Sequence, residues 1–278
     1  MRSLNSAKFP ASFKVGIVIL SIITLLILGA PIIASHDPIE QNSSERLQKP
    51  SNEHPLGTDR FGRDLFSRTL YGGKTTLIAA FLALGAAVLI GLVIGLVTGM
   101  FRGSVIDIIF MRLMDVLLAF PFMVLALVIA GIFGTSFVHL LIAVVSVWWV
   151  SFARLTRSVV LFAQNDTSFA AARILGARPC VIIVRELLPK VLSPVFILAT
   201  FELGSLILSI SALSFLGLGA QPPTPEWGSI LADGRDHFLQ APHILIGPTV
   251  SIILTVFAFN LIGEGLRDRL DPYEITKR

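Results

Sequence analysis

The chain has 278 residues, 54% of them hydrophobic and only 14% charged, and its mean hydropathy is +0.81. An ordinary soluble domain carries roughly 25% charged residues, so this composition excludes a soluble globular protein and indicates a membrane protein. The net charge of +4 comes from basic residues that flank apolar runs, which does not favour a nucleic-acid-binding face. The single cysteine, Cys180, excludes a disulfide framework, a cysteine-rich zinc site and an iron–sulfur cluster.

Five apolar stretches between charged residues are long enough to cross a bilayer, which needs about 20 helical residues. The stretch between Asp115 and Arg154 is long enough for two helices, and residues 131–136 in its middle carry the glycines and hydroxyls of a turn. The sequence therefore predicts an all-α membrane protein with six transmembrane helices. They lie within residues 15–36, 75–101, 116–133, 137–153, 191–225 and 237–263.

The orientation follows from the distribution of basic residues, because cytoplasmic segments are enriched in Lys and Arg. With both termini in the cytoplasm, 15 of the 22 Lys and Arg residues fall in cytoplasmic segments, and six of the other seven lie in one long outer loop. We therefore expect an N-in, C-in topology. A secretory signal peptide is the alternative for the first apolar run, but that run exceeds the roughly 7–15 residues of a signal-peptide core.

The chain is expected to divide into four parts. The outer loop ends near a short amphipathic helix, residues 64–71, that lies at the membrane interface or is a plain surface turn of helix. Its polar face includes Arg63, Asp64, Ser67 and Arg68. The parts are an N-terminal tail with the first helix (1–34), an extracytoplasmic loop (35–73), a five-helix core (74–263) with a cytoplasmic loop (155–190) and an outer loop (214–242), and a cytoplasmic tail (264–278).

Small residues recur every four positions in the second predicted span. In lipid, close backbone approach along such small-residue ridges supplies much of the packing between helices. We therefore expect this helix to be buried against others, although Ala and Gly are also simply common in membrane helices. The ridge consists of Ala79, Ala83, Ala87, Gly91, Gly95 and Gly99.

The loop at 155–190 is too polar to span the membrane and predicts a helix–turn–helix elbow. Residues 165–168, Asn-Asp-Thr-Ser, supply helix N-cap chemistry, and Gly176 is a natural end for a helix over 169–175. Pro179 suits the first turn of a second helix, where its missing N–H is not needed. In the expected topology this elbow protrudes into the cytoplasm.

The elbow carries a recognisable pattern. The stretch Ala-Ala-Arg-Ile-Leu-Gly at 171–176, followed thirteen residues later by Pro189, resembles the EAA loop of ABC-importer permease subunits. The spacing of the small pair, the glycine and the later proline matches that family. Two positions depart from it: Ala170 stands where the family usually has an acid, and Glu186 occupies a position that is often apolar. The first departure removes a charged contact that the family usually has.

Two longer stretches narrow the resemblance to the dipeptide, oligopeptide and nickel branch of this family, and to the second of its two permeases. One is His-Pro-Leu-Gly-Thr-Asp-Arg-Phe-Gly-Arg-Asp at residues 54–64. The other is Ser-Phe-Leu-Gly-Leu-Gly-Ala-Gln-Pro-Pro at 214–223, followed by Glu-Trp-Gly at 226–228. The likeness extends from about residue 54 to 272.

This resemblance implies a transport subunit of the bacterial inner membrane that couples to a partner rather than catalyses. The expected partners are a homologous second permease, two cytoplasmic ATPase subunits that bind ATP and magnesium, an extracytoplasmic solute-binding protein and the lipid bilayer. The chain itself is expected to bind no cofactor. The cargo is a dipeptide or oligopeptide, or alternatively nickel or a metal chelate. The coupling residues implied are Ala170, Ala171, Ala172, Arg173, Gly176 and Pro189.

Glu202 lies within the fifth predicted span, where an ionisable side chain is costly and usually faces a cavity or a partner. It is a candidate for the substrate pathway, or else for a hydrogen bond to a neighbouring helix. No metal site is expected, because the five histidines show no HxxxH or HxH spacing. A short interfacial helix is expected at 227–239, with Glu226, Asp233, Arg235 and Asp236 facing water or a docked binding protein, or else a loop that caps the pore.

Two other classes of protein are poorly supported. A secondary transporter would need ion-coupling carboxylates or broken helices near the midplane, and Glu202 alone is meagre support. A membrane enzyme is not favoured, because no HExxH or GxSxG motif is present. Residues 72–75, Gly-Gly-Lys-Thr, resemble the end of a phosphate-binding loop, but Arg68 stands where that pattern requires its first glycine.

Overall fold

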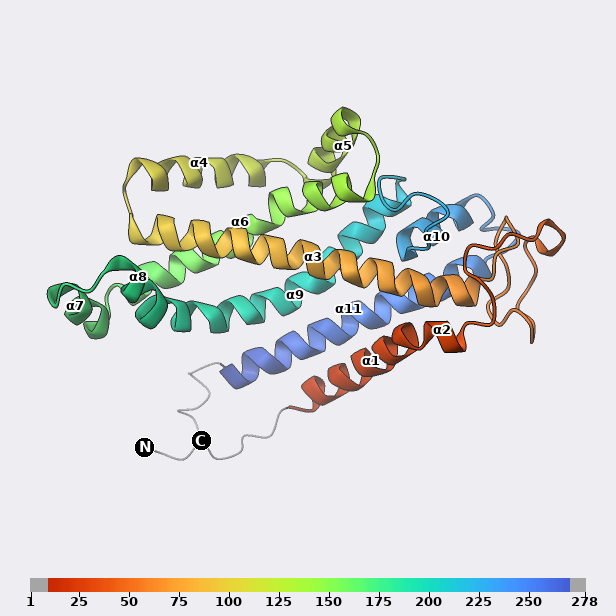
Figure 1. Ribbon diagram of the computed structural model, residues 1–278, viewed down its shortest axis with the longest axis horizontal. Helices are drawn as coiled ribbons and strands as arrows, with labels where there is room; N and C mark the ends of the chain where they lie inside the picture. Colours follow the sequence, from red (N-terminus) through yellow and green to blue (C-terminus); the bar gives the residue numbers. More distant parts are fainter. Residues whose placement is uncertain (1–9, 271–278) are drawn as a thin grey trace.

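The computed structural model describes residues 10–270, which form a bundle of long helices (Figure 1). Within this range the chain forms no β-strand, and its extended pairing is limited to an isolated bridge between Thr58 and Asp64. The expected N- and C-terminal tails lie partly outside the described residues. The helices are α1 (Ala11–Leu28), α2 (Ala30–Ile33), η1 (Ser43–Glu45), α3 (Leu65–Met100), α4 (Val105–Ala119), α5 (Phe122–Phe133), α6 (Phe137–Ala163), α7 (Thr167–Ile174), α8 (Pro179–Ile182), η2 (Ile183–Leu187), α9 (Leu188–Phe215), α10 (Trp227–Arg235) and α11 (His243–Leu270).

Among the described residues, five helical stretches are long and apolar enough to cross a membrane, and a sixth is formed if the bent pair α4 and α5 is taken as one span. Four of the five are α1, α3, α6 and α11, and the other is the continuous stretch Pro179–Phe215 that contains α9. The predicted all-α membrane architecture is therefore confirmed. The N-in, C-in orientation stays a prediction.

The third predicted span differs from expectation. A straight helix over 116–133 was expected, but the helix begins at Val105 and breaks before Pro121, where α4 and α5 meet at 95°. Pro121 has no N–H to donate and disfavours helical geometry at Phe120, whose ψ of 135° is extended. The uninterrupted apolar composition across this proline hid the bend.

The early start of α4 and the late end of α6 have a common cause. Ser104 caps α4 by accepting a hydrogen bond from the Asp107 N–H at 3.2 Å, which places a buried carboxylate in the first turn of α4. Arg157 donates from Nε to Asp107 Oδ1 at 2.9 Å. This pair joins the first turn of α4 to the last turns of α6, which continues to Ala163, ten residues beyond its predicted end at 153.

The expected amphipathic helix at 64–71 is not a separate interfacial element. Its residues form the cap and the first turns of α3, whose 36 residues span about 54 Å at the usual helical rise. Asp64 caps α3 by accepting from the Ser67 N–H at 2.7 Å. The polar face predicted for this segment is buried, with Arg63 and Arg68 only 1% and 2% exposed.

The small-residue ridge of α3 packs against α6. Gly91, Gly95 and Gly99 are so close to α6 that a Cβ built at each would approach heavy atoms of α6 to 2.4, 2.5 and 2.7 Å. The alanines of the ridge, Ala79, Ala83 and Ala87, are at most 1% exposed. The two backbones can approach this closely because the ridge has no larger side chain.

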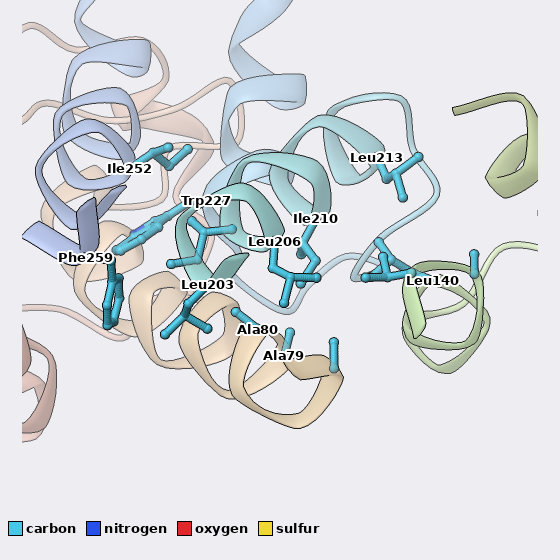
Figure 2. Packing of buried hydrophobic residues seen from close by; sticks show 14 of the residues in the cluster. Ala79, Ala80, Leu140, Leu203, Leu206, Ile210, Leu213, Trp227, Ile252 and Phe259 are labelled. Carbon is cyan, nitrogen blue, oxygen red and sulfur yellow. The ribbon is translucent and has the colours of Figure 1, made fainter. Parts of the chain in front are cut away.

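The core of the bundle lies where α3, α6, α9 and α11 meet. Figure 2 shows Leu203, Leu206 and Ile210 of α9 pointing toward Ala79 and Ala80 of α3, all of them buried. Residues from α1, α5, α6, α10 and α11 also belong to this cluster. The other buried members labelled in Figure 2 are Leu140, Leu213, Trp227, Ile252 and Phe259.

Candidate functional site

The predicted elbow is present as α7, a tight turn and α8. Gly176 has a φ of +74°, a left-handed conformation that suits glycine, and it ends the helix as the sequence predicts. Pro179 lies in the first turn of α8. Asp166 occupies the N-cap position of α7, but its carboxylate accepts from the Lys190 Nζ at 2.6 Å instead of capping the helix.

One side chain anchors the elbow, while its tip is exposed. Phe169 is 5% exposed and belongs to a buried cluster with Ile182 and Leu187. At the tip, the apolar side chains of Ile174 and Leu175 are each 85% exposed. Exposed apolar side chains of this size next to a tight turn are typical of an interaction surface.

The expected coupling residues are divided between the tip and the root of the elbow. Ala170, Ala171 and Arg173 of α7 are exposed, Ala172 is half-buried, and a Cβ built at Gly176 would have open space around it. Pro189 lies at the root, in the first turn of α9. Because Pro189 cannot donate to the carbonyl of Arg185, the preceding turn of residues 183–187 relaxes into a π-helix.

Figure 1 places the elbow and the 35–64 segment at opposite ends of the long helices. The green elbow lies at one end of α6 and α9, and the red-orange segment lies near the start of α3 at the other end. The elbow and the 54–64 signature stretch are thus separated by the length of the bundle.

Glu202 contacts a neighbouring helix. Its Oε2 accepts a hydrogen bond from the Trp148 Nε1 of α6 at 2.8 Å, and the Trp148 ring packs edge-on against Phe122 of α5 at 4.8 Å between centroids. The carboxyl group is half-buried. The structure therefore contains the hydrogen bond that was one of the two expectations for this residue.

An ionic cluster joins the 54–64 signature stretch to α10, and the sequence did not indicate it. Arg63 donates to Asp59 Oδ2 at 2.6 Å and to Asp233 Oδ2 at 2.7 Å. Arg60 also donates to Asp233, at 3.0 Å, and the Arg68 guanidinium lies 3.6 Å from Asp59. Asp233 is therefore a partner of buried arginines, not a residue that simply faces water. Unpaired buried charges are costly, so this cluster holds the outer segments in one arrangement.

Glu226 likewise does not face water. It is fully buried and caps α10, accepting hydrogen bonds from the N–H groups of Gly228 and Ser229 at 3.0 and 2.9 Å and from the Thr76 hydroxyl of α3 at 3.0 Å. Desolvation raises the pKa of the Glu226 carboxyl, and these hydrogen bonds oppose the rise. Trp227 is buried as well and donates from Nε1 to a carbonyl oxygen of α3 at 2.9 Å. The helix α10 ends at Arg235, not at 239.

Comparison with known proteins identifies the family. Residues 91–273 match the family described as binding-protein-dependent transport system inner membrane component. The chain is 43% identical over 258 residues to the dipeptide transport system permease protein of Alkalihalophilus pseudofirmus, covering 93% of this chain and 84% of that protein. It is 41% identical over 256 residues to the glutathione transport system permease protein of an Escherichia coli strain, covering 91% and 84%. Its apolar helices and this family match place it in the bacterial inner membrane as a multi-pass protein. The chain belongs to the family of inner-membrane permease components of binding-protein-dependent ABC importers.

Proposed function

We propose that this permease forms half of a translocation pathway for dipeptides or oligopeptides, with the elbow as its point of contact with an ATPase subunit. The observation that supports this most is the exposed apolar tip of the elbow, which carries the Ala-Ala-x3-Gly spacing of the family. The peptide cargo is inferred from the dipeptide and glutathione permeases that the chain resembles. Nickel or a metal chelate has no comparable support among these relatives.

The connections of α7 suit a mechanical role. A push on α7 reaches the bundle core through the buried ring of Phe169, and it reaches α9 directly through the ion pair between Asp166 and Lys190. The helix α9 also carries Glu202, so movement of the elbow would shift the hydrogen bond to Trp148. Rocking of two packed permease subunits between two discrete arrangements would then open the pathway alternately to each side.

ATP hydrolysis is assigned to separate subunits. The Gly-Gly-Lys-Thr residues at 72–75 lie inside α3, where their N–H groups take part in the helix and are not free to surround a phosphate. Two ATPase subunits, with ATP and magnesium, would bind the elbows of this chain and of a homologous second permease. An extracytoplasmic binding protein would deliver the cargo to the opposite end. In this arrangement a secondary transport mechanism is not required.

The test uses two glycines with matched backbones. Gly176 and Gly103 both have positive φ, +74° and +78°, and both have open space where a Cβ would lie. Asn tolerates this conformation better than most residues, so Gly176→Asn and Gly103→Asn carry similar conformational costs. Only Gly176 lies in the elbow.

The experiment measures ATPase stimulation by cargo-loaded binding protein, and peptide uptake, in proteoliposomes that contain the complete transporter. Gly176→Asn is expected to insert and assemble normally but to lose both activities, because the added side chain blocks close approach at the tip. Gly103→Asn is expected to retain them. Normal transport by the Gly176 variant, or equal loss in both variants, would contradict the coupling role.

A further inference from the structure

We propose that Glu45, Glu53 and His54, in the outer segment before α3, form a binding site for a divalent cation of the zinc type. A carboxylate oxygen from each glutamate and a ring nitrogen of His54 all lie within 4.8 Å of one another. These residues line a cavity of about 240 Å³ at the outer end of the bundle. The spacing of the histidines in the sequence gives no metal signature, and the cluster arises only because the outer segment folds back on itself.

The hydrogen bond of His54 to Asp64 prepares its other ring nitrogen to bind a cation. The His54 Nδ1 lies 2.9 Å from Asp64 Oδ1. Because the Asp64 carboxylate also accepts the capping hydrogen bond of α3 from the Ser67 N–H, it is fixed in place and acts as an acceptor. His54 Nδ1 therefore carries the hydrogen, and in the neutral imidazole the lone pair is on Nε2. Metal-binding histidines are commonly oriented by a carboxylate in this way.

The Nε2 atom of His54 is buried and has no hydrogen-bond partner. His54 is 2% exposed, and the nearest carboxylate oxygen, Glu45 Oε2, lies 3.5 Å away, beyond good hydrogen-bonding distance. A buried nitrogen of this kind is costly unless something occupies its lone pair. A cation between His54 Nε2 and the two glutamates would satisfy the nitrogen and neutralise the carboxylates. The competing interpretation is a protonated His54 that pairs with Asp64 and Glu45 and binds no metal.

Hydrogen bonds hold the backbone around Glu45 and His54 in position. The Leu47 N–H donates to the Asp59 carbonyl at 3.0 Å, and the Glu45 carbonyl accepts from the Thr58 hydroxyl. The Ser51 N–H donates to the His54 carbonyl at 2.9 Å, and the Ser51 hydroxyl accepts from the His54 N–H at 3.1 Å. The backbone at Glu45 is therefore tied to the loop that leads into α3, and His54 is held by Ser51 and, through its ring, by Asp64, while Glu53 is exposed. A cation would meet a backbone that is already ordered around Glu45 and His54.

The ligand set selects the class of cation. One imidazole and two carboxylates suit Zn²⁺ and similar transition ions, whereas Mg²⁺ and Ca²⁺ prefer oxygen ligands alone. A second grouping, His36 with His54 and Asp64, is less suitable. In that grouping Asp64 already accepts two hydrogen bonds, and the His54 nitrogen that faces it carries the hydrogen.

The test is Zn²⁺ titration by calorimetry of the full-length, tag-free protein in lipid nanodiscs after treatment with a chelator. We expect one Zn²⁺ per chain, with millimolar Mg²⁺ and Ca²⁺ failing to displace it. Glu45→Gln and Glu53→Gln should each weaken binding by at least about tenfold, since even the loss of an orienting partner outside the ligand shell costs that much. Neither substitution touches the His54–Asp64 pair, and the unfolding temperature without Zn²⁺ should stay unchanged.

The matched control is Glu40→Gln, which lines the same cavity but lies outside the cluster and should bind Zn²⁺ as the native protein does. The proposal is overturned if the native chain binds no stoichiometric Zn²⁺, as a protonated His54 would require. It is also overturned if both glutamate variants bind with native affinity. Loss of binding in His36→Gln, with binding retained in Glu45→Gln, would also overturn it.

Discussion

The two ends of the bundle are built in opposite ways. At the end that holds residues 54–64, segments 150 or more residues apart in the sequence are joined by side chains in the interior, such as Arg63 with Asp233 and Thr76 with Glu226. At the elbow, anchoring rests on the buried ring of Phe169 and the Asp166–Lys190 ion pair, and the tip is exposed. The sequence motifs at the two ends match the same family. The residues of the 54–64 motif pair with other parts of the same chain, whereas the elbow motif leaves apolar side chains exposed.

This difference indicates where a partner acts. Buried charges resist separation because a charge left without its partner is costly. Residues 54–64 should therefore move as one unit with α3 and α10. An exposed tip is accessible to a partner, which can bind it and displace it. The contrast predicts that substitutions at the outer end cost stability, while substitutions at the elbow cost coupling and leave stability nearly unchanged.

The largest stability loss is expected for Asp233→Ala. It removes the partner of Arg60 and the second partner of Arg63, which is 1% exposed, and breaking a buried ion pair should cost about 3 kcal/mol. The measurement is chemical or thermal unfolding of the purified protein in detergent. Asp236→Ala is the control, because Asp236 pairs only with exposed Arg235 and should stay within about 0.5 kcal/mol of the native value. Equal effects of both substitutions would contradict the claim that the buried ion pairs, and not charge in general, stabilise this end of the bundle.

A middle-sized loss is expected for Gly95→Ala, which tests the contact that connects the two ends. Its new Cβ would lie 2.5 Å from the Thr156 Cβ of α6, and overpacking of this kind should cost about 2 kcal/mol. Gly85→Ala, on the same helix, meets nothing within 4 Å and should be neutral or stabilising, since Gly in a helix costs up to about 1 kcal/mol relative to Ala. The measurement is the free energy of unfolding of both variants. A Gly95→Ala variant as stable as the native protein would contradict the claim that α3 and α6 need a residue without a side chain at this position.

The smallest stability change is expected for Glu202→Gln. The amide oxygen still accepts from the Trp148 Nε1, so the free energy of unfolding should change by less than about 1 kcal/mol. If Glu202 lines the pathway, which is the other expectation for this residue, peptide uptake kinetics will change although assembly does not. Uptake assays on proteoliposomes measure this, with Trp148→Phe as the comparison that removes the hydrogen bond itself. Unchanged uptake by the glutamine variant would leave Glu202 with a structural role only.

Local signals in the sequence were enough to predict the elbow and the small-residue ridge. Gly176 and Pro179 affect the backbone within a few residues of their own positions, and the ridge repeats along a single helix. Each feature can therefore be recognised within one continuous segment of the sequence. The bend before Pro121 was hidden because the apolar composition continues through it.

The contacts between residues 54–64 and α10 could not be predicted from the sequence, because they join residues that are far apart along the chain. One of the two partners of Arg63, Asp233, lies 170 positions away, so the arginine's charge looked like that of an interfacial surface. Likewise, the cluster around His54 depends on how the loop folds back, not on any spacing of histidines. Charge pattern alone does not distinguish a buried arginine with distant partners from an exposed one.

The most direct test of the central claim is the labelling of the elbow tip in Leu175→Cys, Cys180→Ser by a membrane-impermeant maleimide. Leu175 is 85% exposed, so the substitution should leave stability within about 0.5 kcal/mol of the native value. In inverted inner-membrane vesicles, position 175 should be labelled when the ATPase subunits are stripped away and protected when they are added back. Equal labelling with and without the ATPases, or labelling from the outer side of intact spheroplasts, would contradict the account.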